Sequence, residues 1–196
     1  MTTVSPDPVR VESELAAGAL LCPSCGGRLA PWGWARPRDV GRGHDRSRVR
    51  PRRSICRGCR RTHVLLPVSM LARRGDFAAT IGRALELKAA GLGQRPVAAE
   101  VGVSRSTVRG WLSRFAAVAE RVRVHLTRWA LGLDAGLVRI EPCGSGFADA
   151  IAAIAAAGEA AAVRLGIDCR WQFASTATGG RLLCNTTSPF PGPWMR

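Results

Sequence analysis

Two Cys-x-x-Cys pairs constrain this chain more than any other feature of its sequence. They are Cys22-Pro-Ser-Cys25 and Cys56-Arg-Gly-Cys59, and the surrounding residues 21–68 are rich in Gly, Pro and Arg with little apolar periodicity. Each pair is a tight turn that directs two thiolates to one point, and two such turns complete the tetrahedral sulfur shell that a structural zinc ion prefers. The sequence therefore predicts a small zinc-ribbon β unit with Zn²⁺ held by Cys22, Cys25, Cys56 and Cys59.

Disulfide pairing of the same cysteines is the alternative to zinc. In a reducing compartment, thiols in a segment with no other means of support favour the metal. The gap between the pairs is long for such a site, and an inserted hairpin or loop would absorb it. His44 and His63 are possible substitute ligands, but four cysteines already fill the shell, so both are expected at the surface or in packing. A full shell leaves no open coordination position, so the metal is expected to be structural. Three further cysteines show no ligand spacing: Cys143, Cys169 and Cys184.

Arginine dominates the charge of the chain. Lys and Arg total 29 against 14 Asp and Glu, a formal net charge of +15, and Lys88 is the only lysine. Fourteen arginines and two aspartates fall between Arg28 and Arg74. A field this dense repels itself unless phosphates neutralise it, so the predicted partner is double-stranded DNA. Trp32 and Trp34 are expected in the small core of the ribbon, with stacking on bases as the alternative. The predicted phosphate contacts are Arg46, Arg48, Arg50, Arg52 and Arg53.

Residues 76–132 predict a helical domain, because apolar residues there recur at helical spacing. A first helix begins near Phe77 and ends before Gly91. A short second helix runs from about Arg95 to Glu100. Ala98 and Ala99 of the second helix are small, which lets another helix cross closely.

The third helix of this domain has the clearest signals. Gly102 supplies the left-handed backbone of a tight turn, and Ser104 caps the helix that follows. A plain three-helix bundle for protein contacts is the alternative, but short polar and arginine side chains at the start of the helix favour entry into the major groove. The buried stripe is Val108, Trp111, Leu112 and Phe115. The predicted DNA-binding residues are Arg95, Ser104, Arg105, Ser106, Thr107, Arg109 and Ser113.

Residues from about 20 to 130 resemble a family of poorly characterised bacterial proteins that join a zinc ribbon to a helix-turn-helix. The resemblance lies in Cys-Pro-Ser-Cys-Gly-Gly, in Cys-Arg-Gly-Cys, and in the segments Thr62–Pro67 and Val103–Trp111. These proteins resemble the DNA-binding front end of transposases and are often associated with mobile elements. The third helix also resembles the homeodomain-like units of resolvases and transposases. The resemblance implies architecture and DNA binding, and it brings no established activity.

The remaining segments complete a prediction of four parts. Residues 1–20 are expected to be a tail with a possible helical turn over Val11–Leu20. Residues 133–196 are expected to form an Ala-rich helix followed by an extended tail from Trp171. The helix is expected over Phe147–Leu165. A further helical stretch, Val118–Leu133, either prolongs the third helix or forms a fourth. The predicted fold class is mainly α with a small zinc-ribbon β unit, in which a homeodomain-like three-helix bundle is followed by further helices.

The predicted function is that of a zinc-containing, sequence-specific helix-turn-helix DNA-binding protein, either a transposon-associated accessory factor or a transcriptional regulator. The alternatives are a transposase or recombinase, and a general nucleic-acid-binding zinc-ribbon protein. The sequence has no tyrosine, which excludes a tyrosine recombinase. No enzymatic activity is expected, because no catalytic spacing links the available carboxylates. These are Asp134, Glu141, Asp149, Glu159 and Asp168.

The expected partners besides DNA are a separate transposase or a second copy of the chain. No small-molecule substrate is evident. The N-terminus is polar, and no stretch is expected to have the apolar length that spans a bilayer. A cytoplasmic, nucleoid-associated location is therefore expected.

Overall fold

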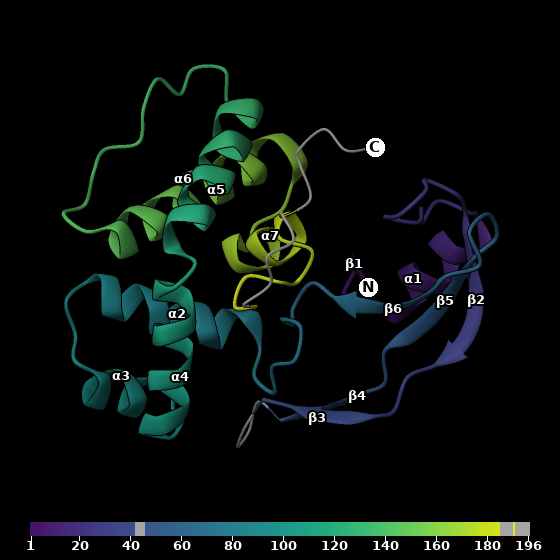
Figure 1. The fold of residues 1–196 in the computed structure, drawn as a ribbon, viewed down its shortest axis with the longest axis horizontal. Helices are drawn as coiled ribbons and strands as arrows, with labels where there is room; N and C mark the ends of the chain where they lie inside the picture. The colour runs from purple at the N-terminus through teal and green to yellow at the C-terminus, as the bar shows by residue number, and fades with distance from the viewer. Residues whose placement is uncertain (42–45, 185–189, 191–196) are drawn as a thin grey trace.

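Alternating buried residues build a mixed sheet from the N-terminal third of the chain (Figure 1). The computed structural model describes residues 1–41, 46–184 and 190. The strand order is β1-β6-β5-β2, with β5 antiparallel to both neighbours and β1 parallel to β6. These strands are β1 (Thr2–Val4), β2 (Leu29–Trp34), β5 (Arg52–Cys56) and β6 (Thr62–Pro67).

The first twenty residues are part of this sheet and its core, so the prediction of an N-terminal tail is wrong. Thr2 pairs with Leu65 of β6, and helix α1 (Pro8–Ala16) buries Val11 and Leu15 against the sheet. The Asp7 side chain accepts a hydrogen bond from an N–H of the first turn and so starts this helix. The helical turn expected from residue 11 to residue 20 therefore begins and ends earlier.

A hairpin is inserted between β2 and β5, as the long gap between the cysteine pairs predicts. Its strands are β3 (Arg38–Val40) and β4 (Ser47–Val49), which pair in antiparallel fashion. Val40 is fully buried and anchors the hairpin against Leu66 and Met70. In Figure 1 the hairpin runs from the sheet toward the helical part of the molecule.

Three helices form the predicted helix-turn-helix: α2 (Ala78–Ala89), α3 (Gln94–Glu100) and α4 (Arg105–Ala116). Gly102 has φ +65° in the turn before α4. All four residues of the predicted stripe on α4 are buried, together with Ile81 and Leu85 of α2. The fold class predicted from the sequence is therefore confirmed for this domain.

Three more helices continue the same core: α5 (Ala119–Leu133), α6 (Gly146–Leu165) and α7 (Arg170–Ala177). Helix α5 is separate from α4, which decides between the two alternatives that the sequence leaves open. Helix α6 ends at Leu165, as the sequence predicts, and Gly166 caps it with φ +67°. One hydrophobic cluster contains buried residues from every helix between α2 and α7. The predicted division after residue 132 therefore cuts through a continuous core.

Trp171 and the residues that follow it as far as Ala177 lie in helix α7, so the prediction of an extended tail from Trp171 is wrong there. Trp171 and Phe173 are buried in the helical core. Trp171 lies directly over Gly82 of α2, where an added Cβ would stand 2.0 Å from the indole ring. The indole Nε1 also donates a hydrogen bond to Glu86 at 3.0 Å. The later part of the predicted tail, residues 185–189 and 191–196, lies outside the described residues.

Helix α6 has the length and composition of a membrane span, which is contrary to the expectation from the sequence that no such stretch occurs. It has a mean hydropathy of 1.5 over its apolar window and is the single helix of this kind among the described residues. Its alanines at 153, 157 and 161 are fully buried in the core. The core helix of a globular protein meets the same criterion, so this feature is weak evidence for a membrane.

Candidate zinc centre and nucleic-acid interface

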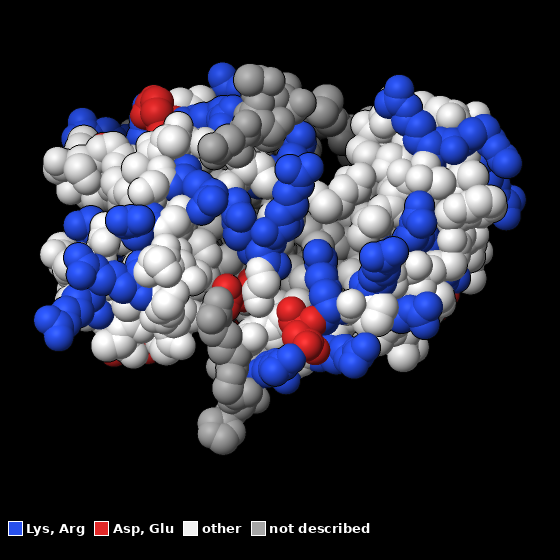
Figure 2. Space-filling model, turned by 60° about the horizontal axis from the view of Figure 1, so that its bottom comes forward, with Lys and Arg blue, Asp and Glu red and all other residues white. Residues whose placement is uncertain are grey.

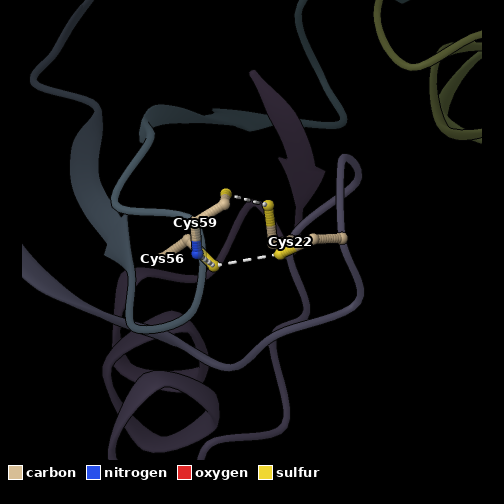
Figure 3. Close-up of side chains that lie close together, drawn as sticks. Cys22, Cys56 and Cys59 are labelled. Carbon is tan, nitrogen blue, oxygen red and sulfur yellow. Dashed lines mark hydrogen bonds between the residues drawn. The ribbon is translucent and has the colours of Figure 1, made fainter.

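The four predicted cysteine ligands converge on one point (Figure 3). Their Sγ atoms all lie within 4.8 Å of one another, with 3.7 Å between Cys22 and Cys59 and 3.4 Å between Cys25 and Cys56. A tetrahedral zinc site with bonds of about 2.3 Å has sulfur–sulfur edges of about 3.8 Å, so the cluster has the dimensions that a zinc ion requires. These separations are far longer than the bond of about 2.05 Å in a disulfide. All four cysteines are free, which favours metal binding over disulfide pairing.

The first knuckle is closed by backbone hydrogen bonds around Cys22. The Cys22 N–H donates to the carbonyl of Gly27 at 2.8 Å, and the Gly26 N–H donates to the carbonyl of Cys22 at 2.9 Å. Gly26 has φ +70°, which glycine adopts without strain. A Cβ at Gly27 would lie 3.1 Å from the Cys56 sulfur. Glycine at these two positions thus allows the chain to turn tightly around the sulfurs.

The second knuckle repeats the same pattern with different residues. The Cys56 N–H donates to the carbonyl of Arg61 at 2.9 Å, and the Arg60 N–H donates to the carbonyl of Cys56 at 3.1 Å. Arg60 occupies the position equivalent to Gly26 and has φ +60°. A left-handed conformation is unfavourable for a residue with a Cβ. Two equivalent knuckles facing each other are the architecture of a zinc ribbon.

The thiols of the cluster differ in how readily they ionise without a metal. Burial opposes ionisation of Cys22, but the N–H groups of Ser24 and Cys25 outweigh it and lower the pKa of Cys22 to about 6. The N–H of Cys59 lowers the pKa of Cys56 against the effect of burial. An N–H also favours the Cys59 thiolate, but burial and the neighbouring thiols raise the pKa of Cys59 to about 11. A divalent cation supplies the positive charge that four adjacent thiolates need.

His63 lies beside the cluster on β6 and is buried. Its Nε2 is 3.4 Å from the Cys22 sulfur, and its Nδ1 is 3.3 Å from the N-terminal amine of Met1. The four cysteines form a complete shell without it, so His63 supports the position of Cys22 through contact. His44, the other histidine considered as a substitute ligand, lies outside the described residues.

The start of α4 presents the polar face that the sequence predicts. The Ser104 side chain accepts a hydrogen bond from the Thr107 N–H at 3.2 Å and lies 2.8 Å from the Thr107 hydroxyl. These two residues are therefore occupied in capping the helix. Four other predicted DNA-binding residues are exposed on α4: Arg105, Ser106, Arg109 and Ser113. Arg95 is exposed on α3.

The five arginines predicted to contact phosphates have different environments. Arg46 forms an ion pair with Asp39, and its partner lies on the same hairpin. Arg48 and Arg50 are exposed. Arg53 is half-buried in β5, and its Nε has no hydrogen-bond partner among the described residues. Arg46, Arg48 and Arg50 are therefore the exposed members of this set, and Arg46 is already paired with Asp39.

Arg52 has a structural role that the sequence does not reveal. Its side chain is only 13% exposed and pairs with Glu12 of α1 at 2.6 Å, so it links the first helix to the sheet. Its guanidinium also lies 4.8 Å from the Trp34 ring centroid. Trp32 and Trp34 are 52% and 44% exposed, so the expectation that they form the ribbon's core is wrong. The core is formed instead by residues of β1, α1, β2 and β6 with two of the cysteines.

The structure also gathers arginines that the sequence leaves far apart. One groove between the ribbon and the helical part is lined by Arg38, Arg73, Arg74, Arg114 and Arg181. The Arg73-Arg74 doublet is visible in the sequence as part of the arginine-rich stretch. No spacing signal connects it to residues 114 and 181, because only the tertiary fold brings them together.

The fold and the two sites together define a helix-turn-helix protein with a four-cysteine centre of the zinc-ribbon type. Residues 79–119 match the family model of a homeodomain-like domain, which covers most of α2 and all of α3 and α4. This match suggests DNA binding, and the cysteine cluster suggests zinc binding. Comparison of the chain with curated proteins and with solved structures gives no match.

Proposed function

We propose that this protein binds specific sequences in double-stranded DNA, with α4 in the major groove and a structural zinc ion stabilising the ribbon. The observation that carries the proposal is the exposed face of α4, where Arg105, Ser106 and Arg109 stand free of the helical core. Arginine reads guanine through paired hydrogen bonds, and short hydroxyl side chains contact either strand. The exposed Arg95 on α3 is the proposed contact to a backbone phosphate.

Within this proposal the protein is a transposon-associated accessory factor or a transcriptional regulator and not an enzyme. The resemblance to the DNA-binding part of transposases supports such a role. Among the described residues, the four cysteines are the one group of three or more metal-binding side chains with converging ligand atoms. Glu141 pairs with Arg139, and Asp149 accepts a hydrogen bond from the Cys143 N–H. DNA binding would place the protein on the nucleoid.

Selection of duplexes from a random DNA library with zinc-loaded protein tests sequence-specific binding. We expect an enriched motif, and a palindromic motif would add a second copy of the chain as partner. Arg109→Ala should cost about 1–3 kcal/mol of binding free energy and relax the preference at one base position. Arg164→Ala is the matched control, because Arg164 is exposed near the end of α6.

The same experiment separates this proposal from its alternatives. Tight, salt-sensitive binding without an enriched motif would identify a general nucleic-acid-binding protein. An equal loss on all sequences for Arg109→Ala would contradict base readout by that residue. Incubation of the protein with magnesium and varied DNA substrates tests for a transposase, which would nick or join the DNA.

A further inference from the structure

The arginine-lined groove is bounded by five arginines from separate segments of the chain. It has a volume of about 880 Å³ and lies between the ribbon and the helical part. Its arginines come from β3, from the loop between β6 and α2, from α4, and from the segment after α7. Figure 2 shows arginines gathered on both sides of the hollow between the two parts. None of the described residues that line it is acidic.

Two of these arginines are partly withdrawn from water, and neither is paired with an Asp or Glu in the part of the chain that the structure describes. Arg38 and Arg74 are half-buried, and the Nε of each is buried with no hydrogen-bond partner among the described residues. Burial lowers the pKa of both guanidinium groups, and the charge of Arg114 adds to this effect on the pKa of Arg74. Desolvated cations that face one another cost free energy unless an anion enters between them.

Hydrogen bonds to backbone carbonyls hold two of the groove's arginines in place. Arg74 donates a hydrogen bond to the carbonyl of Leu183 at 2.8 Å, and Arg114 donates one to the carbonyl of Gly110 at 2.9 Å. A Cβ at Gly110 would stand 2.8 Å from the Arg114 guanidinium, so the glycine gives this side chain room to lie along α4. Guanidinium groups fixed in this way match the paired oxygens of a phosphate.

We propose that this groove binds the sugar–phosphate backbone of the duplex that α4 reads, with phosphate contacts from Arg38, Arg74 and Arg114. This inference rests on the proposed function. Arg114 connects the two surfaces, because it follows Ser113 of the exposed face and lies about 100° further around the helix. A helix in the major groove has a phosphate backbone along each side, so the strand beside Arg114 is the one the groove receives. The half-buried Val64 also lines the groove and can contact sugar carbons, whereas Leu66 and Leu183 are each 1% exposed and lie beneath its surface.

The test compares two triple variants of the full-length, zinc-loaded protein. The groove variant is Arg38→Gln, Arg74→Gln and Arg114→Gln. The control removes the same charge from exposed positions elsewhere, through Arg128→Gln, Arg139→Gln and Arg164→Gln. The dissociation constant of each protein for one fixed duplex is measured over a range of salt concentrations. For three lost phosphate contacts, the slope of log K against log[salt] should fall by roughly 2 to 3 in the groove variant and by less than about 1 in the control.

A variant that keeps the three positive charges distinguishes the loss of phosphate contacts from a loss of folding. With Arg38→Lys, Arg74→Lys and Arg114→Lys, phosphate binding should be largely restored, because lysine also binds phosphate as a point charge. Zinc content and thermal melting report whether each variant is folded. If the lysine variant loses as much affinity as the glutamine variant, the arginines act through packing and the inference is overturned.

Two further outcomes separate this inference from the function on which it rests. If the wild-type protein does not bind duplex DNA, the proposed function fails. If the wild type binds but the groove and control variants have equal salt slopes, the groove inference alone fails.

A single-stranded oligothymidine competitor should displace the duplex poorly. Displacement by the single strand at equal concentration would assign the groove to unpaired nucleic acid and overturn the proposal for a duplex.

Discussion

The ribbon and the helical part of this protein are held together by different means. The ribbon core contains five buried aliphatic residues and two cysteines. The helical core is a continuous cluster that takes buried residues from each of the helices α2 to α7. Because small units bury too little apolar surface to be stable alone, they depend on metals or disulfides. The small core of the ribbon gives a physical reason why the four-cysteine cluster, which could hold a metal ion, lies in this part of the chain.

The two parts are nevertheless joined by specific contacts. The Ala72 N–H donates to the carbonyl of Gly180 at 2.7 Å, and the Ser175 hydroxyl donates to the carbonyl of Met70 at 2.8 Å. A Cβ at Gly180 would stand 2.5 Å from Leu66 of β6. The segment after β6 and the end of α7 therefore form the junction between the two parts.

Removal of the metal should have the largest effect and should be confined to the ribbon. Structural zinc contributes an apparent 10–16 kcal/mol, roughly, to the folding of small zinc peptides at pH 7. We expect Cys56→Ser or a strong chelator to release zinc and unfold the sheet, while α2–α7 keep their amide hydrogen-exchange protection. Cys143→Ser is the control, because Cys143 is not part of the cluster. Full zinc content in Cys56→Ser would remove Cys56 from the ligand shell.

Overpacking at Gly82 should damage the helical part and leave the ribbon intact. A methyl group there would collide with the Trp171 ring, so Gly82→Ala should destabilise the protein by about 1–3 kcal/mol in denaturant unfolding. Gly75→Ala is the matched control, since a Cβ at Gly75 meets nothing within 4 Å. Zinc content should be unchanged in both variants. A Gly82→Ala protein as stable as the control would mean that α7 does not dock on α2 as described.

Relief of backbone strain at Arg60 should stabilise the ribbon alone. Its φ of +60° is unfavourable for a residue with a Cβ, so Arg60→Gly should raise ribbon stability by up to about 1 kcal/mol. The gain is reduced because glycine adds entropy to the unfolded chain. Competition with a chelator should show slower zinc loss. Arg57→Gly in the same knuckle removes the same charge without a positive φ, and an equal effect there would assign the change to charge.

Acidification should weaken the helical part slightly through His125. Burial lowers the pKa of His125 from 6.5, although a hydrogen bond with the Ala177 carbonyl acts in the opposite direction. The unfolded chain therefore binds the proton more readily, so stability is complete above about pH 6.5 and falls as the pH drops below it. Melting temperatures of zinc-loaded protein between pH 7.5 and 5.5 should fall less for His125→Gln than for the wild type. Parallel curves would exclude His125 as the titrating group.

The cysteine knuckles and the helix ends could be predicted from the sequence, because their geometry depends on residues that are close together in the chain. The Cys-x-x-Cys spacing sets each knuckle because only a few bonds separate the two sulfurs. Ser104 begins α4 and Gly166 ends α6 through contacts within one helical turn. These features could be predicted because their free energy is decided within a few residues of chain.

Contacts between distant residues were decided by the tertiary structure. Strand β1 exists because Thr2 pairs with Leu65, and α7 docks because Trp171 meets Gly82. The burial of Arg52 likewise depends on α1, which supplies Glu12. The arginine groove has the same origin, since its members lie on separate segments. Sequence alone determined the two knuckles, the three helices of the helix-turn-helix and helix α6, whereas β1, α7 and the meeting of surfaces depended on burial and pairing across the whole chain.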